Sequence, residues 1–294
     1  MITVKSDVRS EEILQSRRHV LFVEGSDPEG IDPQILRVLL EDKIRVEVLG
    51  PSFHIESAAR ALFSHHPDYY FLIDRDHYED EFVRKCWDEF PSPETPNLLV
   101  WRRREIENYF LDPAYLEHSS YLKVSTDRLS EQIVESCNRR LFLDVVNQVI
   151  ISIRENHKRR WIELFSNPNE FGTYDEALRK LTAIAQFPER LNFVRESVGA
   201  ERLQAMFHDI YVRFTGDRYP LEYGVGEWLQ FIKGKKVFPQ VMGSCFEVKD
   251  KNANRINGKD KLREIAKDLV KKGIDVQPQD FQDIHRIIMK RISE

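Results

Sequence analysis

The sequence predicts an α/β protein that combines a four-stranded parallel sheet with a C-terminal, mainly helical domain. Four short apolar segments have the length and composition of strands, at residues 19–23, 44–49, 69–73 and 97–101. Segments with the apolar spacing of helices separate them, and this alternation is typical of a parallel sheet. After Pro113 the spacing is mostly helical. We therefore expect a sheet domain at residues 1–115 and a helical domain at residues 116–294.

The helices between the predicted strands have recognisable ends. The dipeptide Asp32-Pro33 suits an N-cap and a first helical position, and this helix should extend to about Asp42. A second helix is expected over Ser52–His65, and a third should end near Glu89. The strand at 44–49 alternates apolar and charged residues, which predicts that one of its faces is open to water.

The second half of the chain has the 3.6-residue periodicity of amphipathic helices. Between these segments, residues 250–257 are polar and predict a loop. The expected helical segments lie at about 129–165, 174–186, 188–197, 200–214, 227–232, 259–272 and 280–292.

The composition is that of a soluble globular protein, with 41% hydrophobic and 32% charged residues. No apolar run approaches the roughly 18 residues of a membrane helix, and the N-terminal residues lack the apolar core of a signal peptide. The three cysteines, Cys86, Cys137 and Cys245, are odd in number and widely spaced. We therefore expect free thiols and a cytoplasmic protein without membrane contact.

Charge is unevenly distributed along the chain. Residues 1–97 hold 11 Lys and Arg against 20 Asp and Glu, whereas residues 233–272 hold 12 against 5. An acidic part that holds cations and a basic part that holds phosphates suit a metal-dependent nuclease, although a basic segment can equally be a solvated helix face. The arginines at 102–104 could bind backbone phosphates or pair with the nearby Glu105 and Glu107.

Carboxylates follow two of the predicted strands directly. Glu24 and Gly25 come after the first strand, and Asp74 and Asp76 come after the third. Open parallel sheets keep their sites at the carboxyl ends of strands, so these three acids should lie on one edge. Carboxylate oxygens are the ligands that Mg²⁺ prefers, and residues two apart on an extended chain point the same way. The sequence therefore predicts a divalent-metal site.

These motifs resemble those of the TOPRIM domain, which topoisomerases, primases and nucleases of the overcoming-lysogenization-defect (OLD) family share. The resemblance rests on Val23-Glu24-Gly25 and Asp74-Arg75-Asp76 and covers about residues 19–113. The segment from Arg104 to Leu111 is similar to a stretch of OLD-like nucleases, and Phe231–Lys235 is similar to their Gly-Lys element. The resemblance implies a phosphodiesterase that depends on Mg²⁺ or Mn²⁺.

By this resemblance, Glu24 and Asp74 would bind one metal ion with help from Asp76. Lys235 would neutralise negative charge on the phosphate during the reaction, as a positioned ammonium can. Lys259, in Asn257-Gly258-Lys259, competes for the same role.

A second metal ion would be held by Glu107, or less directly by Glu105, together with Asp27. OLD-like sequences usually carry an acid four residues after the first glutamate, and this chain has Pro28 there. The flanking Asp27 and Glu29 could each substitute for it. The departure leaves the composition of the second metal site open.

The chain contains no Walker A motif, so any ATP hydrolysis requires a partner. The chain resembles stand-alone TOPRIM effectors of two-gene anti-phage systems of the PARIS type, which implies an ABC-type ATPase partner, a toxic nuclease and a possible homodimer. The substrate would be RNA, including tRNA, or DNA. The alternative is a non-catalytic TOPRIM interaction protein, which Pro28 favours. A third interpretation, with less support in the sequence, is a primase-like or ligand-binding TOPRIM protein.

Overall fold

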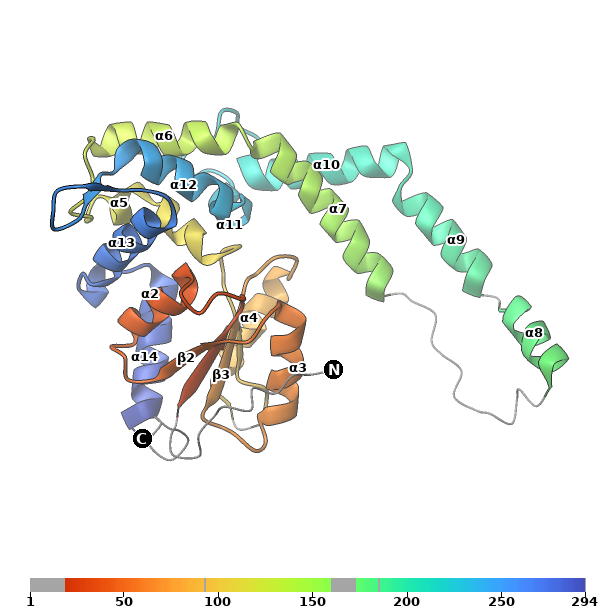
Figure 1. The fold of residues 1–294 in the computed structure, drawn as a ribbon. Helices are drawn as coiled ribbons and strands as arrows, with labels where there is room; N and C mark the ends of the chain where they lie inside the picture. The colour runs from red at the N-terminus through yellow and green to blue at the C-terminus, as the bar shows by residue number, and fades with distance from the viewer. Residues whose placement is uncertain (1–18, 93, 160–172, 185, 294) are drawn as a thin grey trace. The chain divides into compact units, whose positions relative to one another are not determined.

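The computed structural model describes residues 19–293 apart from 93, 160–172 and 185. Its centre is a four-stranded, all-parallel sheet in the order β2-β1-β3-β4, which confirms the predicted fold class (Figure 1). The strands lie within one or two residues of their predicted positions, at Val20–Val23 (β1), Arg45–Val48 (β2), Tyr69–Ile73 (β3) and Leu98–Val100 (β4).

The strand order places the ends of β1 and β3 side by side. From β1 the chain moves outward to β2 and then crosses back to β3 on the other side of β1. Val23 at the end of β1 pairs with Val48 on one side and with Leu72 on the other. This reversal is the topological switch point at which parallel sheets bind ligands. As predicted, β2 is only partly buried.

Three helices connect the strands and cover the sheet. They are α2 (Ile31–Leu39), α3 (Ser52–Leu62) and α4 (Asp80–Glu89). Figure 1 shows α3 and α4 on the opposite face of the sheet from α2. The predicted N-cap at Asp32 is wrong: Gly30 caps α2, and Asp32 lies in its first turn. The helix begins earlier because Ile31 can enter it while Pro33 occupies the third helical position without needing a donor.

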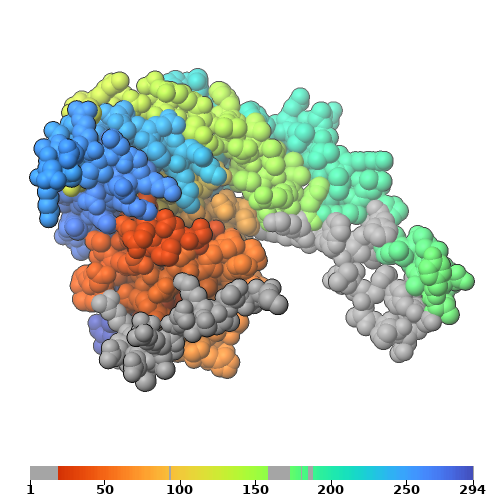
Figure 2. Space-filling model, viewed as in Figure 1, coloured from red at the N-terminus to blue at the C-terminus, as the bar shows by residue number. Residues whose placement is uncertain are grey.

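The chain from Leu229 onward returns to pack on this sheet domain. Residues up to Arg139 and from Leu229 onward form one compact unit, in which α13 packs against α2. Figure 2 shows the surface of these late residues lying directly against the early ones. The later elements of this unit are η1 (Ile106–Leu111), α5 (Pro113–Leu116), α6 (Thr126–Asn138), α12 (Gly234–Cys245), α13 (Gly258–Val270), η3 (Ile274–Val276) and α14 (Gln279–Ser293).

Residues 250–254 are a loop as predicted, but they form the turn of a short antiparallel hairpin, and residues 255–256 of the predicted loop are a strand. Val248–Lys249 (β5) pairs with Arg255–Ile256 (β6). Asp250 closes the turn, because its side chain accepts hydrogen bonds from the backbone N–H groups of Asn252 and Asn254. Local turn chemistry of this kind needs no apolar periodicity, so the periodicity of the sequence did not reveal it.

The second compact unit, Arg140–Trp228, is helical in its described residues. Its helix α7 packs against α10. The helix predicted to reach about residue 165 is described only to Arg159, because 160–172 lie outside the described residues. The elements are α7 (Leu141–Arg159), α8 (Tyr174–Thr182), α9 (Gln186–Ser197) and α10 (Ala200–Thr215), with α11 (Trp228–Phe231) at the junction.

The packing therefore divides the chain at other positions than the boundary predicted near residue 115. The predicted boundary was placed where the spacing of apolar residues changes from that of strands to that of helices. The compact units depend instead on which helices and strands pack against one another. No helix of the described residues is long and apolar enough to cross a lipid bilayer. The three cysteines are free, and burial raises the pKa of Cys86 to about 11.

Candidate active site

The structure brings Glu24 and Asp74 together at the switch point of the sheet. Glu24 follows β1 and Asp74 follows β3, and the backbone N–H of Asp74 donates a hydrogen bond to Glu24 Oε2 at 3.3 Å. Asp74 is only 6% exposed. Burial raises the pKa of Glu24, and the charge of nearby Asp76 raises it further. The two predicted acids therefore form one electrostatically coupled group.

Asp76 reaches this group by a different backbone path from the one predicted. It lies in a turn with φ +40°, so Asp74 and Asp76 are not two same-facing residues of an extended chain. Arg75 between them is buried and turned away, with its guanidinium donating to the carbonyl oxygen of Arg102 at 2.7 Å. Asp76 itself is exposed at the rim.

Lys235 lies among the carboxylates at the beginning of α12. Its Nζ lies 2.7 Å from Asp74 Oδ2 and 3.4 Å from Glu105 Oε2. Its backbone N–H also donates to Glu105 Oε1 at 2.6 Å. Burial of the ammonium lowers its pKa, but the carboxylates of Asp74, Glu107, Asp32 and Glu105 outweigh this and raise the pKa above its ordinary value. Lys235 is therefore a cation at neutral pH.

Glu105 and Glu107 are both buried, one on each side of the start of η1. Glu105 accepts a hydrogen bond from the backbone N–H of Lys235, whereas Glu107 Oε2 is buried without a hydrogen-bond partner. Burial raises the pKa of Glu107 well above its ordinary value, and the charges of Asp32, Glu105 and Asp74 act in the same direction. A carboxylate held this way is unstable as an anion unless a cation approaches it.

A cavity of about 380 Å³ opens beside this group. Its lining includes Glu24, Asp27, Asp32, Glu107, Lys235 and Lys259. Both candidate lysines therefore face the same cavity, but Lys235 is the one with an ion pair to Asp74.

Asp27 lines the same cavity on its exposed side. Arg263 of α13 lies 3.3 Å from Asp27 Oδ2, so this carboxylate already has a cationic partner. Glu29 turns the other way and accepts a hydrogen bond from Gln34 of α2. Asp27 and Glu107 both line the cavity, and the prediction that they share a metal ion stays a prediction.

Asp32 is the residue of the site that the sequence did not reveal. It lies half-buried in the first turn of α2. Burial raises its pKa to about 6; the charges of Glu105 and Glu24 also raise it, and Lys235 lowers it. An aspartate before proline at a helix start has the appearance of a cap, and only the docking of α12 and η1 makes it part of the site.

The raised pKa of Asp32 predicts an unusual dependence of stability on pH. A carboxyl whose folded pKa is about 6 against an ordinary 3.8 binds its proton more tightly when folded. Folding stability is therefore lost as the pH rises from about 4 through about 6. We expect Asp32→Asn to raise the free energy of unfolding at pH 7.5 by on the order of 2 kcal/mol. Urea unfolding without divalent cations at pH 4 and pH 7.5 measures this, and an equal effect at both values contradicts it.

The carboxylate oxygens of the site offer ligands to a divalent metal ion. Among the residues that the structure describes, no group of three or more His, Cys, Asp or Glu side chains is gathered closely enough to hold an ion. Two buried carboxylate oxygens, Asp74 Oδ1 and Glu107 Oε2, nevertheless lack any hydrogen-bond partner. Hard, unpaired oxygens of this kind fit Mg²⁺ or Mn²⁺.

The arginines at 102–104 have partners within the fold. Arg102 pairs with Asp280 and Asp283 of α14 and stacks over Trp87. Arg103 donates to the carbonyl oxygen of Asn108 at 2.8 Å, and Arg104 is buried. Tertiary partners on α14 and around η1 thus engage these guanidinium groups, and their contact with backbone phosphates stays a prediction.

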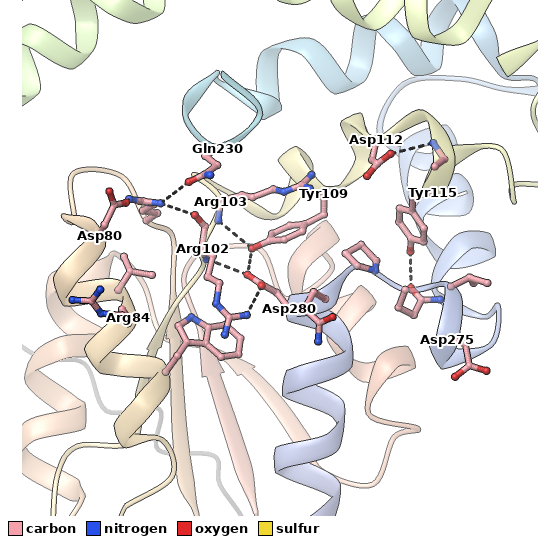
Figure 3. Close-up of a pocket in the computed structure, with 18 of the residues that line it drawn as sticks. Asp80, Arg84, Arg102, Arg103, Tyr109, Asp112, Tyr115, Gln230, Asp275 and Asp280 are labelled. Atoms are coloured by element: carbon pink, nitrogen blue, oxygen red, sulfur yellow. Dashed lines mark hydrogen bonds and ion pairs between the residues drawn. The ribbon is translucent and has the colours of Figure 1, made fainter. Parts of the chain in front are cut away.

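A second cavity of about 690 Å³ lies behind this arginine cluster (Figure 3). Arg75 reaches Gln230 there, and Tyr109 and Arg102 converge on Asp280. Its charged groups largely neutralise one another, and none of the four acids Glu24, Asp74, Glu105 and Glu107 lines it. The smaller cavity is therefore the candidate active site.

The fold and this site together define an α/β protein with carboxylates and a lysine at a sheet switch point. A scan against models of protein families and a search of curated protein sequences both give no match. The resemblance to TOPRIM proteins therefore depends on the motifs quoted above.

Proposed function

We propose that this chain is a metal-dependent nuclease. The observation that carries the proposal is the convergence of Glu24, Asp74 and Lys235, from three distant segments, on one edge of the sheet. Two acids and a cation beside a solvent-open cavity are the groups that phosphodiester hydrolysis needs. The TOPRIM-like motifs support the same conclusion.

In this proposal, Glu24 and Asp74 hold Mg²⁺ or Mn²⁺ with Asp76 at the rim, and Glu107 with Asp32 supplies the further oxygens. The ion, when bound, lowers the pKa of a water molecule and neutralises charge on the phosphate. Lys235 remains protonated among the acids, and its ammonium group donates a hydrogen bond to the phosphate oxygen and neutralises its negative charge. Asp27 orients Arg263 instead of binding metal.

Nucleic acid is the proposed substrate, either RNA, including tRNA, or DNA. Lys259 and Arg263 lie one helical turn apart on α13, and both line the cavity. They belong to the basic segment at 233–272 and would contact backbone phosphates on either side of the bond to be cut.

The resemblance to effectors of two-gene anti-phage systems extends the proposal to a role in anti-phage defence in the cytoplasm. An ABC-type ATPase would hold the nuclease inactive, and release would make it toxic. A homodimer is also proposed, supported by exposed apolar side chains along α7, at Phe142, Leu143, Val146 and Ile150. Light scattering of the purified chain measures its mass directly, and a monomer at micromolar concentration contradicts the dimer.

Glu24→Gln provides the test of the enzymatic proposal. The purified wild type should cut total tRNA, single-stranded RNA or plasmid DNA with Mg²⁺ or Mn²⁺ and stop with EDTA, and Glu24→Gln should be inactive with each. The same pair is expressed in cells with and without the proposed ABC-type ATPase partner. The proposal is overturned if neither the wild type nor Glu24→Gln is toxic in cells and neither cleaves nucleic acid in vitro.

The alternative function is a non-catalytic TOPRIM module within an ATPase complex. Pro28 and the ion pair of Asp27 with Arg263 favour it, since together they leave the family's second acidic position without a free carboxylate. In that case the wild type and Glu24→Gln bind the ATPase equally and neither cuts nucleic acid.

A further inference from the structure

Lys235 follows a short connection, and the loop after β4 binds four of its carbonyl oxygens. We call residues 229–235 the lysine strap. Asn108 lies fully buried beneath it. Its Nδ2 donates hydrogen bonds to the carbonyl oxygens of Leu229 at 2.9 Å and Ile232 at 2.8 Å. One amide group thus ties both ends of a single turn.

Arg104 binds the two carbonyls between them. Its backbone N–H donates to the carbonyl oxygen of Gln230 at 2.7 Å, and its Nη1 donates to that of Phe231 at 3.0 Å. Its own carbonyl oxygen accepts a hydrogen bond from Arg75 N at 2.9 Å. The strap is therefore connected through Arg104 to the residue that follows Asp74 in the chain.

Gly234 completes the contact by allowing the strap to touch Asn108. A Cβ atom at this position would lie 2.4 Å from Asn108 Oδ1 and 2.8 Å from its backbone nitrogen. Both distances are far below van der Waals contact, and the backbone atom cannot move aside. Any side chain here would lift the strap, and Lys235 is the next residue.

The segment from Arg104 to Asn108 consequently has two faces. Glu105 and Glu107 face the acidic group, whereas Arg104 and Asn108 face the strap. Sequence motifs around acidic residues are usually interpreted through the acids alone. In this structure Arg104 and Asn108, which flank the two acids, contact the lysine strap instead.

We propose that Arg104 and Asn108 are positioning residues, which fix the lysine strap so that the Lys235 ammonium lies between Asp74 and Glu105. Neither touches the cavity beside the acids. The consequence for catalysis rests on the proposed nuclease function, but the positioning itself does not. Residues 229–231 of the strap belong to α11 and residues 234–235 begin α12. The four carbonyl bonds from Arg104 and Asn108 hold the connection between these helices, and together with the bond from the Lys235 backbone N–H to Glu105 they fix where Lys235 lies.

The chain offers a matched control for Asn108. Asn97 is also buried, and its Nδ2 also donates to two carbonyl oxygens, those of Pro67 at 2.8 Å and Tyr69 at 3.2 Å. It lies at the opposite end of the sheet from the site. Asn108→Asp and Asn97→Asp each remove one buried amide donor shared by two carbonyls, and only the first should affect Lys235.

The test is acetylation of the intact protein by a limiting amine-reactive ester, quantified per lysine by mass spectrometry. Both Lys235 and Lys236 are exposed, but the Lys235 ammonium is paired with Asp74 and Glu105, so in the wild type it should react at least several-fold more slowly than Lys236. In Asn108→Asp its rate should approach that of Lys236, while Asn97→Asp keeps the wild-type ratio. Circular dichroism and thermal melts confirm folding, and Asn108→Ser replaces Asn108→Asp if the latter does not fold.

The outcomes separate the two proposals. If Lys235 stays protected in folded Asn108 variants, or Asn97→Asp exposes it equally, the positioning role is wrong. If Lys235 is released but the wild type cuts no nucleic acid, the positioning role holds and the nuclease proposal fails. If both hold, the Asn108 variant should lose kcat with little change in KM, because Lys235 acts on charge that develops in the reaction.

Discussion

Replacing Asp74 by asparagine is expected to lower the turnover of nucleic-acid cleavage by about 10³-fold. The substitution keeps the shape of the side chain and removes the charge that would hold a metal ion and that binds Lys235 at 2.7 Å. Because several carboxylates of the site repel one another, removing one should leave stability equal or higher. Initial cleavage rates across a Mg²⁺ titration measure the effect.

Asp144→Asn is the matched control for this substitution. Asp144 is also buried and pairs with a cation, Arg140, but both belong to the other compact unit. Its loss should lower stability and leave the rate per folded molecule unchanged. A comparable fall in rate for both variants would assign the effect to folding instead of chemistry.

Removing Asp280 should have the largest effect on stability. Asp280 is 5% exposed and accepts hydrogen bonds from the backbone N–H and Nη1 of Arg102 and from the hydroxyl of Tyr109. Asp280→Ala leaves the buried hydroxyl and part of the guanidinium without an acceptor, which should cost about 3 kcal/mol. The result is measured as the free energy of unfolding in urea, and a loss below about 1 kcal/mol contradicts it.

Tyr109→Phe separates the parts of this network. It removes the hydrogen bond that the hydroxyl donates to Asp280 and the one that it accepts from the backbone N–H of Arg103, and it keeps the ring that packs against Trp101 and Phe281. The expected loss is about 1 kcal/mol, well below that of Asp280→Ala. Neither substitution touches the acids of the site, so metal-dependent cleavage per folded molecule should persist in both.

Much of the sheet and half of the site could be predicted because their signals are local. A buried parallel strand needs a continuous apolar run, and β3 was predicted at its observed bounds, Tyr69–Ile73. Open parallel sheets keep their sites at the carboxyl ends of strands, so Glu24 and Asp74 were expected on one edge of the sheet, whereas the strand order came from the structure. Lys235 came from the family resemblance, and its contact with Asp74 agrees with that expectation.

The remaining site residues depend on contacts between segments far apart in the chain. Asp32 resembles a cap until α12 brings Lys235 towards it, and Asp27 resembles a metal ligand until α13 supplies Arg263. The arginines at 102–104 resemble a phosphate clamp until α14 and the lysine strap engage them. The partners of Asp32, Asp27, Arg102 and Arg104 named here lie more than a hundred residues away, and a local pattern carries no record of them.

The sequence by itself determined the parallel sheet, the acids at its switch point and the helical character of the later chain, because apolar periodicity and strand-end chemistry are short-range properties. Only the tertiary structure decided which carboxylates keep free oxygens, which lysine pairs with Asp74, and that the chain from Leu229 returns to the sheet. Those outcomes depend on burial and long-range pairing, which set the charge of a group only after the chain has folded.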